Sequence, residues 1–176
     1  RIDNGAWATT GEAASLALAA DALEGPSLIA FGDILCRRHV LQSLLDDDAD
    51  LVIAADRNIR RDGDGRDRPR DLVKLHEPPP HAFLDGDVTM AGAAFSNAFA
   101  GFDAEWIGLL KCSPRGSEAV RGWLAAQAGR GDFAQLGIID LLAALQAEGH
   151  RIKVHLVSGD WTTIEDAIDL AEAGNL

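Results

Sequence analysis

The stretch SLIAFGDILC at residues 27–36 decides the fold class of this chain. Its first half is an apolar run with the length of one buried strand, and the run ends at Gly32 and then at an acid, Asp33. In a parallel α/β sheet, ligands bind in the crevice at the carboxyl ends of the strands. A carboxylate at that place is well positioned to hold a divalent cation against a phosphate. The alternative is that Asp33 only caps the following helix, because aspartate is a favoured N-cap residue.

The segments on both sides of this stretch predict a strand–helix–strand unit. The predicted order is a helix over residues 10–23 with Thr10 as its N-cap, a strand over 28–31, a helix over 37–45, a solvated acidic turn at 46–48 and a strand over 51–55. Two strands joined by one helix and tight turns are expected to be parallel.

The rest of the chain continues this alternation without an internal repeat or a second domain boundary. A charged, glycine-containing stretch at residues 57–70 is predicted to be a surface loop that interrupts it. Further strands are predicted over residues 72–75, 88–95 and 152–157, and further helices over 116–128 with Ser117 as cap, 137–147 and 164–173. Residues 1–176 therefore count as a single domain.

Composition excludes several classes of protein. Hydrophobic residues make up 47% of the chain, too many for a disordered tail, and the formal charge of −12 argues against nonspecific nucleic-acid binding. No apolar run approaches the ~20 residues that cross a bilayer. The two cysteines, Cys36 and Cys112, lie far apart, which suits free thiols in a reducing cytoplasm. A cytoplasmic location is therefore expected.

A second acid follows another predicted strand end. Asp160 stands in the sequence Gly159-Asp160-Trp161, directly after the strand at residues 152–157. If that strand and the strand before Asp33 are near neighbours, the two carboxylates could share one cation. The alternative is that Asp160 is a helix-entry cap.

The segment EWIGLLK at residues 105–111 places an acid, an aromatic ring and an ammonium in one short apolar run. Glu105 could receive a substrate amine or hydroxyl, and Lys111 could hold a phosphate or phosphonate. The alternative is that Trp106 belongs to the core and that both charged side chains extend to solvent. The residues alone leave the two interpretations open.

Taken together, these motifs resemble a known family. The segments TGEAASL at residues 10–16, FGDIL at 31–35, RDLV at 70–73, EWIGLLK at 105–111 and GDWTTIED at 159–166 recur in its order and cover nearly the whole chain. The chain resembles the nucleotidyltransferase domains of phosphonate biosynthesis, the cytidylyltransferase domain often fused to phosphoenolpyruvate mutase. FGDIL alone is nonspecific, and its combination with EWIGLLK is much more specific.

The resemblance implies a fold and an activity. The fold would be sugar-nucleotidyltransferase-like, with a mixed, mainly parallel central sheet flanked by helices. The activity would be Mg²⁺-dependent transfer of CMP from CTP to a small phosphonate such as 2-aminoethylphosphonate, with release of pyrophosphate. No nucleic acid or membrane is expected as a partner, for the reasons of composition given above. A homo-oligomer is plausible because the exposed edge of the strand at residues 28–31 and the insertion need covering, and the resemblance adds an associated phosphoenolpyruvate mutase domain as a plausible partner.

The resemblance also carries residue roles. Asp33 would bind the catalytic magnesium, with Asp160 as a possible second ligand. Glu105, Trp106 and Lys111 would lie near the acceptor, with Lys111 in a catalytic role. Ser15 and Trp161 are carried over as substrate-binding residues, and Trp161 would also support the second metal-ligand turn.

Two departures from the family pattern have consequences. The family turn reads Gly-His-Trp-x-Asp-Ile, and its aspartate, the second metal ligand, is replaced here by Thr163, a poorer ligand for magnesium. The glycine-rich loop, arginine and lysine that cradle the triphosphate are expected before Arg1, which would make residues 1–176 the C-terminal part of a longer domain. Both departures leave open a second interpretation, a catalytically impaired assembly or regulatory module.

Overall fold

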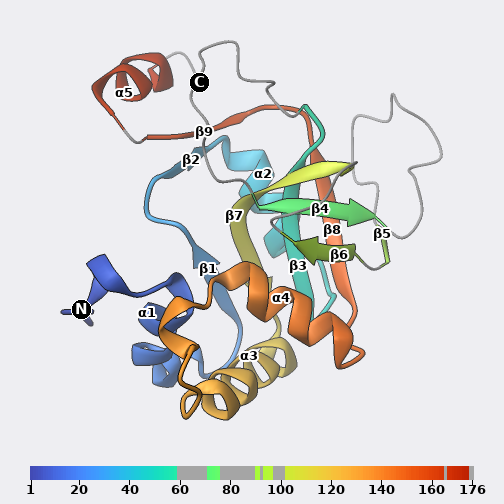
Figure 1. Cartoon of the computed structure of the whole chain (residues 1–176). Helices are drawn as coiled ribbons and strands as arrows, with labels where there is room; N and C mark the ends of the chain where they lie inside the picture. Colours follow the sequence, from blue (N-terminus) through green and yellow to red (C-terminus); the bar gives the residue numbers. More distant parts are fainter. Residues whose placement is uncertain (59–70, 76–89, 92, 97–101, 165, 175–176) are drawn as a thin grey trace.

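A computed structural model describes residues 1–58, 71–75, 90–91, 93–96, 102–164 and 166–174 (Figure 1). The elements in chain order are η1 (Trp7–Thr9), α1 (Glu12–Leu18), η2 (Ala20–Leu23), β1 (Ser27–Ala30), β2 (Ile34–Cys36), α2 (Arg38–Leu45), β3 (Leu51–Asp56), β4 (Leu72–Leu75), β5 (Met90–Ala91), β6 (Ala93–Ser96), β7 (Ala104–Cys112), α3 (Pro114–Gln127), η3 (Phe133–Gln135), α4 (Ile138–Ala147), β8 (Ile152–Val157), β9 (Trp161–Thr163) and α5 (Ala167–Ala173). The predicted loop at 57–70 lies outside the described residues from position 59 onward, as do Arg70 and part of the predicted strand at 88–95.

The centre of the molecule is a seven-stranded mixed sheet in the order β5-β8-β3-β7-β4-β6, with β1 also paired to β7. Strands β3 and β8 form a hydrogen-bonded parallel pair, and β7 runs antiparallel to β1, β3 and β4. Strands β1, β3, β4 and β8 therefore share one direction. The expected mixed α/β sheet flanked by helices is confirmed.

The predicted strand–helix–strand unit has the expected direction but a different neighbour relation. Strands β1 and β3 run the same way, yet β7 lies between them and pairs with both. On the described residues β1 pairs only with β7, along residues 27–30, so its other edge carries no described strand. The periodicity of a sequence predicts each strand on its own. It does not predict that a strand from later in the chain, here β7, pairs between two earlier ones.

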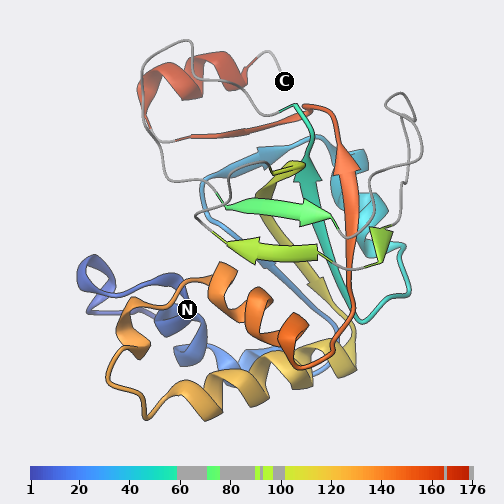
Figure 2. The same ribbon diagram turned by 45° about the vertical axis from the view of Figure 1, so that its right-hand side comes forward.

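Helices cover the two faces of the sheet unequally (Figure 2). Helices α1, α3 and α4 bury one face in the larger core cluster, around Trp123, Leu142 and Ile53. The other face is covered by α2, whose Val40 and Leu44 pack on Val52 and neighbouring residues. Among the described residues, no helix is long and apolar enough to cross a bilayer.

Several helix ends differ from the prediction. The first helix starts after its N-cap Gly11 rather than at Thr10, and it ends at Leu18, before the separate turn η2. Gly11 lies so close to the backbone at Leu136 that a Cβ would not fit there. Ser113, not Ser117, caps α3 and accepts a hydrogen bond from the Gly116 N–H at 3.2 Å. Proline at the first helical position favours this earlier start. The last helix, predicted from residue 164, begins at Ala167 in α5, and it ends at Ala173 as predicted.

A β-bulge interrupts β7 where β3 and β1 both pair with it. The register shifts between Ile53 and Ala55, and Gly108 within the bulge has φ +80°. The Phe31 side chain packs directly over Gly108, and the indole N–H of Trp106 donates to the Leu109 carbonyl at 2.8 Å. The indole thus satisfies a backbone acceptor within the bulge. This part of EWIGLLK shapes the strand just below the turn that carries Asp33.

Candidate active site

The carboxyl ends of three strands meet at one edge of the sheet. Because β1, β3 and β8 share a direction, their last residues, Ala30, Asp56 and Val157, open toward the same side, where β2 and β9 form a separate two-stranded ribbon (Figure 1). The antiparallel β7 begins at this edge, with Glu105 opposite Asp56. The edge is therefore the candidate active site that the strand pattern predicts.

Asp33 lies at this edge in the turn between β1 and β2, and its residue is exposed. Its backbone carbonyl accepts a hydrogen bond from the Ile164 N–H at 2.9 Å, which ties the turn to the end of β9. The alternative role as a helix cap is wrong, because the next element is the strand β2 and the N-cap of α2 is Arg37. The carboxylate is left accessible to a ligand.

Asp160 does not converge with Asp33. Its carbonyl accepts from the Arg37 N–H at 2.8 Å, so the two acids lie at opposite ends of the β2–β9 ribbon. Four residues along a strand separate them by about 13 Å. The predicted sharing of one cation is therefore not supported by the geometry. The two acids are separated because β2 and β9 pair antiparallel, which places the start of β9, next to Asp160, beside the end of β2 and away from Asp33.

The Asp160 carboxylate has other partners. It lies 2.9 Å from Nε of Arg37 and 3.3 Å from Nε2 of His39, and its backbone adopts φ +62°. The alternative of a helix-entry cap is also wrong, since β9 follows it. Asp160 instead ties the turn after β8 to the start of α2.

Position 163 is the part of the β9 turn that lies near Asp33. Thr163 pairs with Ile34, the residue after Asp33, in the ribbon register. The resemblance places a metal-binding aspartate at this position, and the chain carries a neutral hydroxyl there. This departure from the family pattern therefore falls beside the predicted metal ligand.

Asp56 is a buried acid at this edge that the sequence interpretation did not single out. Its residue is 4% exposed, and its carboxylate accepts hydrogen bonds from the backbone N–H groups of Asn58 (2.7 Å) and Gly159 (3.2 Å) and from the indole of Trp161 (2.6 Å). An acid closing a fully buried strand is a signal that such donors must exist. Two of those donors come from about a hundred residues later, so sequence spacing does not identify them.

Glu105 lies at the candidate edge as predicted, half-buried and paired with Asp56 and Leu72. Trp106 does not line it. The indole is 3% exposed and packs edge-to-face on Phe31, with ring centroids 5.2 Å apart. This burial does not support the prediction that Trp106 binds substrate and agrees with the alternative that it belongs to the core, although Lys111, at 9% exposed, does not extend to solvent as that alternative expected. Alternation along a strand turns it away from the face of Glu105.

Lys111 lies at the opposite edge of the sheet. It pairs with Leu28 and Val52 near the starts of β1 and β3, and its ammonium donates to the carbonyls of Asp47 at 2.5 Å and Ala49 at 3.0 Å. The predicted catalytic role beside Asp33 is therefore not supported. Because β7 is antiparallel and nine residues long, its two charged residues end at opposite edges.

Ser15 and Trp161, the two remaining residues predicted to bind substrate, both form hydrogen bonds with other side chains of the protein. Ser15 is exposed on α1, and its hydroxyl accepts from the Asn4 amide at 2.9 Å. Helix α1 lies in the helical layer, below the β2–β9 ribbon in Figure 1. The Trp161 indole is bonded to Asp56, which agrees with a role in supporting the turn.

The predicted magnesium ion has limited support from the protein side. Among the described residues, no group of three His, Cys, Asp or Glu side chains could hold a metal. Magnesium is commonly bound through one or two carboxylates plus substrate phosphates and water. Asp33 alone fits that description as a single protein ligand.

Solved structures share this fold. The chain is similar to the inositol-1-phosphate CTP transferase from T. maritima (TM-score 0.69, 14% identity, 98% of this chain and 64% of that one). It is also similar to a UDP-glucose pyrophosphorylase (TM-score 0.64, 14% identity, 95% and 61%) and to the CTP:phosphocholine cytidylyltransferase from Streptococcus pneumoniae (TM-score 0.62, 14% identity, 98% and 66%). No protein-family model and no curated protein sequence matches it.

These likenesses define a class of fold. Nearly all of the chain superposes on nucleotidyltransferase structures, so its fold is a nucleotidyltransferase fold. The chain spans somewhat less than two thirds of the length of these structures.

Proposed function

We propose that this chain is part of a nucleotidyltransferase that transfers CMP from CTP to a small phosphonate such as 2-aminoethylphosphonate. The observation that carries the proposal is an exposed carboxylate, Asp33, at the carboxyl edge of a nucleotidyltransferase fold. By their names, two of the similar proteins use CTP, and their acceptors carry a phosphate group. A phosphonate presents the same kind of anionic oxygen to the reaction.

The reaction needs positioning and charge neutralisation more than covalent chemistry by the protein. A phosphonate oxygen attacks the α-phosphorus of CTP, a new P–O bond forms, and the bond to the bridging oxygen breaks so that pyrophosphate leaves. Asp33 would hold magnesium, which supplies the neutralising charge when bound. Glu105 would orient the acceptor, for instance by binding the amine of 2-aminoethylphosphonate. Asp56 and Trp161 would keep the neighbouring turn in place.

We also propose that residues 1–176 are one incomplete domain in a cytoplasmic protein. Two observations support this: no described strand pairs with the outer edge of β1, and the similar structures are longer than this chain. Residues that cradle the triphosphate would then belong to a preceding segment. Its sequence, with a glycine-rich loop, an arginine and a lysine, would test this part of the proposal.

The test of the activity is pyrophosphate release by the complete polypeptide, with CTP, Mg²⁺ and 2-aminoethylphosphonate. We expect turnover, and we expect Asp33→Asn to lower it by about a hundredfold, as for loss of one electrostatic contact to the reacting group. Asp48→Asn, an exposed acid at the end of α2, is the charge-matched control and should keep the activity. No pyrophosphate release across several phosphonates would refute the proposal.

A second candidate is a catalytically impaired module, associated for example with a phosphoenolpyruvate mutase. Thr163 at the ligand position and the separation of Asp33 from Asp160 favour it. Thr163→Asp discriminates between the two candidates. A large gain in turnover would show that the natural site is impaired, and unchanged robust turnover would show that one carboxylate with water suffices.

A further inference from the structure

A cavity lies away from the candidate active site. It is a pocket of about 840 Å³ between α2 and β8, on the sheet face that α2 covers. Asp33, Asp56 and Glu105 do not line it. Its volume is within the usual range of small-molecule sites. The pocket is therefore separate from the acids of the candidate active site.

Cationic side chains gather at one end of this pocket. Arg37, Arg38 and His39 follow one another at the start of α2 and all line the cavity. Arg37 and His39 share the Asp160 carboxylate, whereas Arg38 is exposed and forms no ion pair with any described residue. The guanidinium of Arg38 is thus available to a ligand, in a chain whose net charge is −12.

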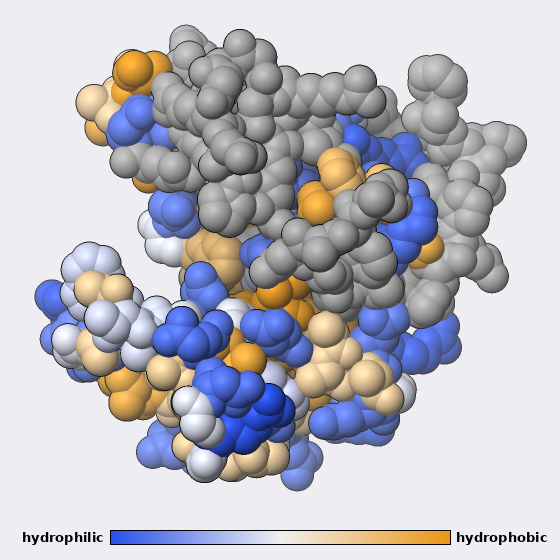
Figure 3. All heavy atoms as spheres, viewed as in Figure 1, coloured by the Kyte–Doolittle hydropathy of each residue, from blue (hydrophilic) through white to orange (hydrophobic). Residues whose placement is uncertain are grey.

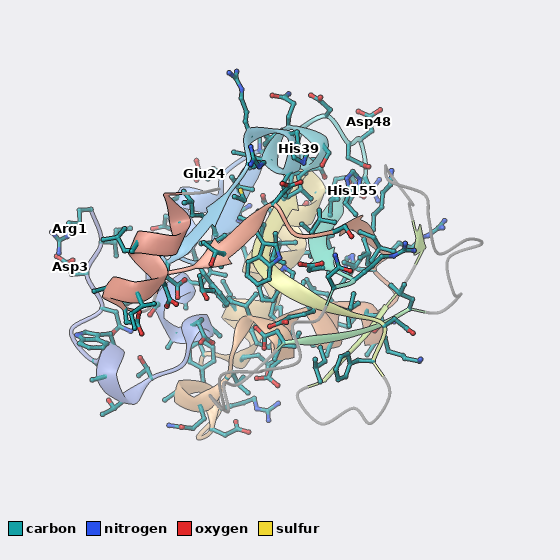
Figure 4. All side chains as sticks on the ribbon, turned by 90° about the horizontal axis from the view of Figure 1, so that it is seen from above. Arg1, Asp3, Glu24, His39, Asp48 and His155 are labelled. Atoms are coloured by element: carbon teal, nitrogen blue, oxygen red, sulfur yellow. The ribbon has the colours of Figure 1, made fainter. Side chains whose placement is uncertain are left out.

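At the other end of the pocket, the charged side chain of Asp47 already has partners within the protein. Asp47 forms an ion pair with Lys153 and a hydrogen bond of 2.8 Å with Nε2 of His155, and its side chain is only 6% exposed. Burial raises the pKa of Asp47, but hydrogen bonds from Lys153, Ala49 and His155 outweigh it and lower the pKa to about 2. The carboxylate is therefore ionised and already matched. Figure 4 shows His39 and His155 on the same side of the molecule, near Asp48.

The charges of α2 are reversed relative to its helix dipole. Arg37 at the N-cap offers no side-chain cap, and the first turn contains no acid but two further basic residues, Arg38 and His39. The acidic run at residues 46–48 follows the C-terminal end. Both arrangements oppose the dipole and cost stability. An anion beside Arg38 would offset the cost at the amino end.

We propose that the pocket between α2 and β8 binds a small phosphorylated compound, with its phosphate at Arg38. The guanidinium supplies paired donors that match phosphate oxygens, and it is the one of the two neighbouring arginines that Asp160 does not already engage. Asp46 lines the far end and repels the anion, which keeps the phosphate near the start of α2. The site lies apart from the candidate active site and does not depend on its activity.

Calorimetric titration of the whole chain with inorganic pyrophosphate tests the proposal. EDTA is present, so that metal-dependent binding at the candidate active site does not contribute. We expect saturable binding that weakens at least tenfold in Arg38→Gln and stays within twofold of wild type in Arg130→Gln. Arg130 is an exposed arginine beyond the far end of α3, so this control removes the same charge elsewhere. Thermal unfolding confirms that both variants are folded.

Three results would overturn the proposal: no saturable binding at millimolar pyrophosphate, equal weakening in both variants, or ligand-induced NMR shifts at Asp33 and Glu105 instead of His39 and His155. Parallel titrations with glycerol phosphate identify the ligand class. Tighter binding of glycerol phosphate supports a monoester, and tighter binding of pyrophosphate supports a diphosphate. Either preference, if it is lost in Arg38→Gln, supports the site.

Discussion

At the scale of single residues, the acids of this chain have three different fates. Asp33 is exposed at the sheet edge, Asp56 is buried and holds the turn at Gly159 and Trp161, and Asp160 is paired with Arg37 and His39. All three stand in similar sequence contexts, just after strands. Their difference comes from the donors that the fold brings to each of them, and of these three acids only Asp33 is left accessible to a ligand at this edge.

Asp71 is a fourth acid, and it predicts a pH dependence of stability. Burial, with the nearby carboxylates of Glu12 and Asp140, raises its pKa to about 6. The folded state thus favours the protonated form. The stability that this contributes is present below pH 4 and is lost as the pH rises through 6.

Asp71→Asn should therefore stabilise the chain at pH 8 and have little effect at pH 4. Raising the pKa of Asp71 from 3.8 to about 6 would correspond to ~3 kcal/mol of stability lost at high pH, which the partial exposure of the side chain reduces to about 1 kcal/mol. Melting temperatures between pH 4 and pH 8 measure the effect, with Asp48→Asn as charge-matched control. A difference between variant and wild type that does not grow with pH would contradict the assignment.

At the scale of elements, the bulge in β7 connects the EWIGLLK segment to the turn that carries Asp33. Gly108 has φ +80°, and a Cβ at this position would lie 2.7 Å from the Phe31 ring. The sequence suggested a cluster of functional side chains here. Instead, Trp106 and Gly108 shape the backbone on which Phe31 rests.

Gly108→Ala should destabilise the chain by about 2 kcal/mol or more, because it adds both backbone strain and a clash with Phe31. Gly122→Ala is the matched control, since it lies in α3 with nothing within 4 Å of the added Cβ. That variant should be stabilised by roughly 0.5–1 kcal/mol. Urea unfolding of both variants measures the contrast, and similar destabilisation in both would refute this role of the bulge.

At the scale of the whole molecule, apolar side chains are exposed at several places, among them β1 and α5. No described strand pairs with the outer edge of β1, and Leu28 on this strand is 41% exposed. Helix α5 exposes Ile168 and Leu170, and the corresponding apolar patch is visible over α5 in Figure 3. Open strand edges favour pairing with another chain. The 176-residue chain on its own is therefore expected to self-associate through β1.

A lysine on the edge strand should suppress this association. Ala30→Lys places the charge on an exposed position of β1, and Ala126→Lys makes the same change on the exposed face of α3. Sedimentation velocity should show a shift toward monomer for Ala30→Lys alone. A monomeric wild-type chain, or equal shifts in both variants, would contradict pairing through β1.

The sequence by itself determined most of the helices and longer strands and the class of fold, but not the short strands β2 and β9, because apolar periodicity and turn residues are local signals. It placed β1, β3, β8 and α4 within a residue or two, and it placed Asp33 at a strand end. It did not determine which residues meet. The insertion of β7 between β1 and β3 sent Lys111 to the far edge, and the β2–β9 register separated Asp33 from Asp160. Such pairings join residues up to 130 positions apart, so only the tertiary structure decides them.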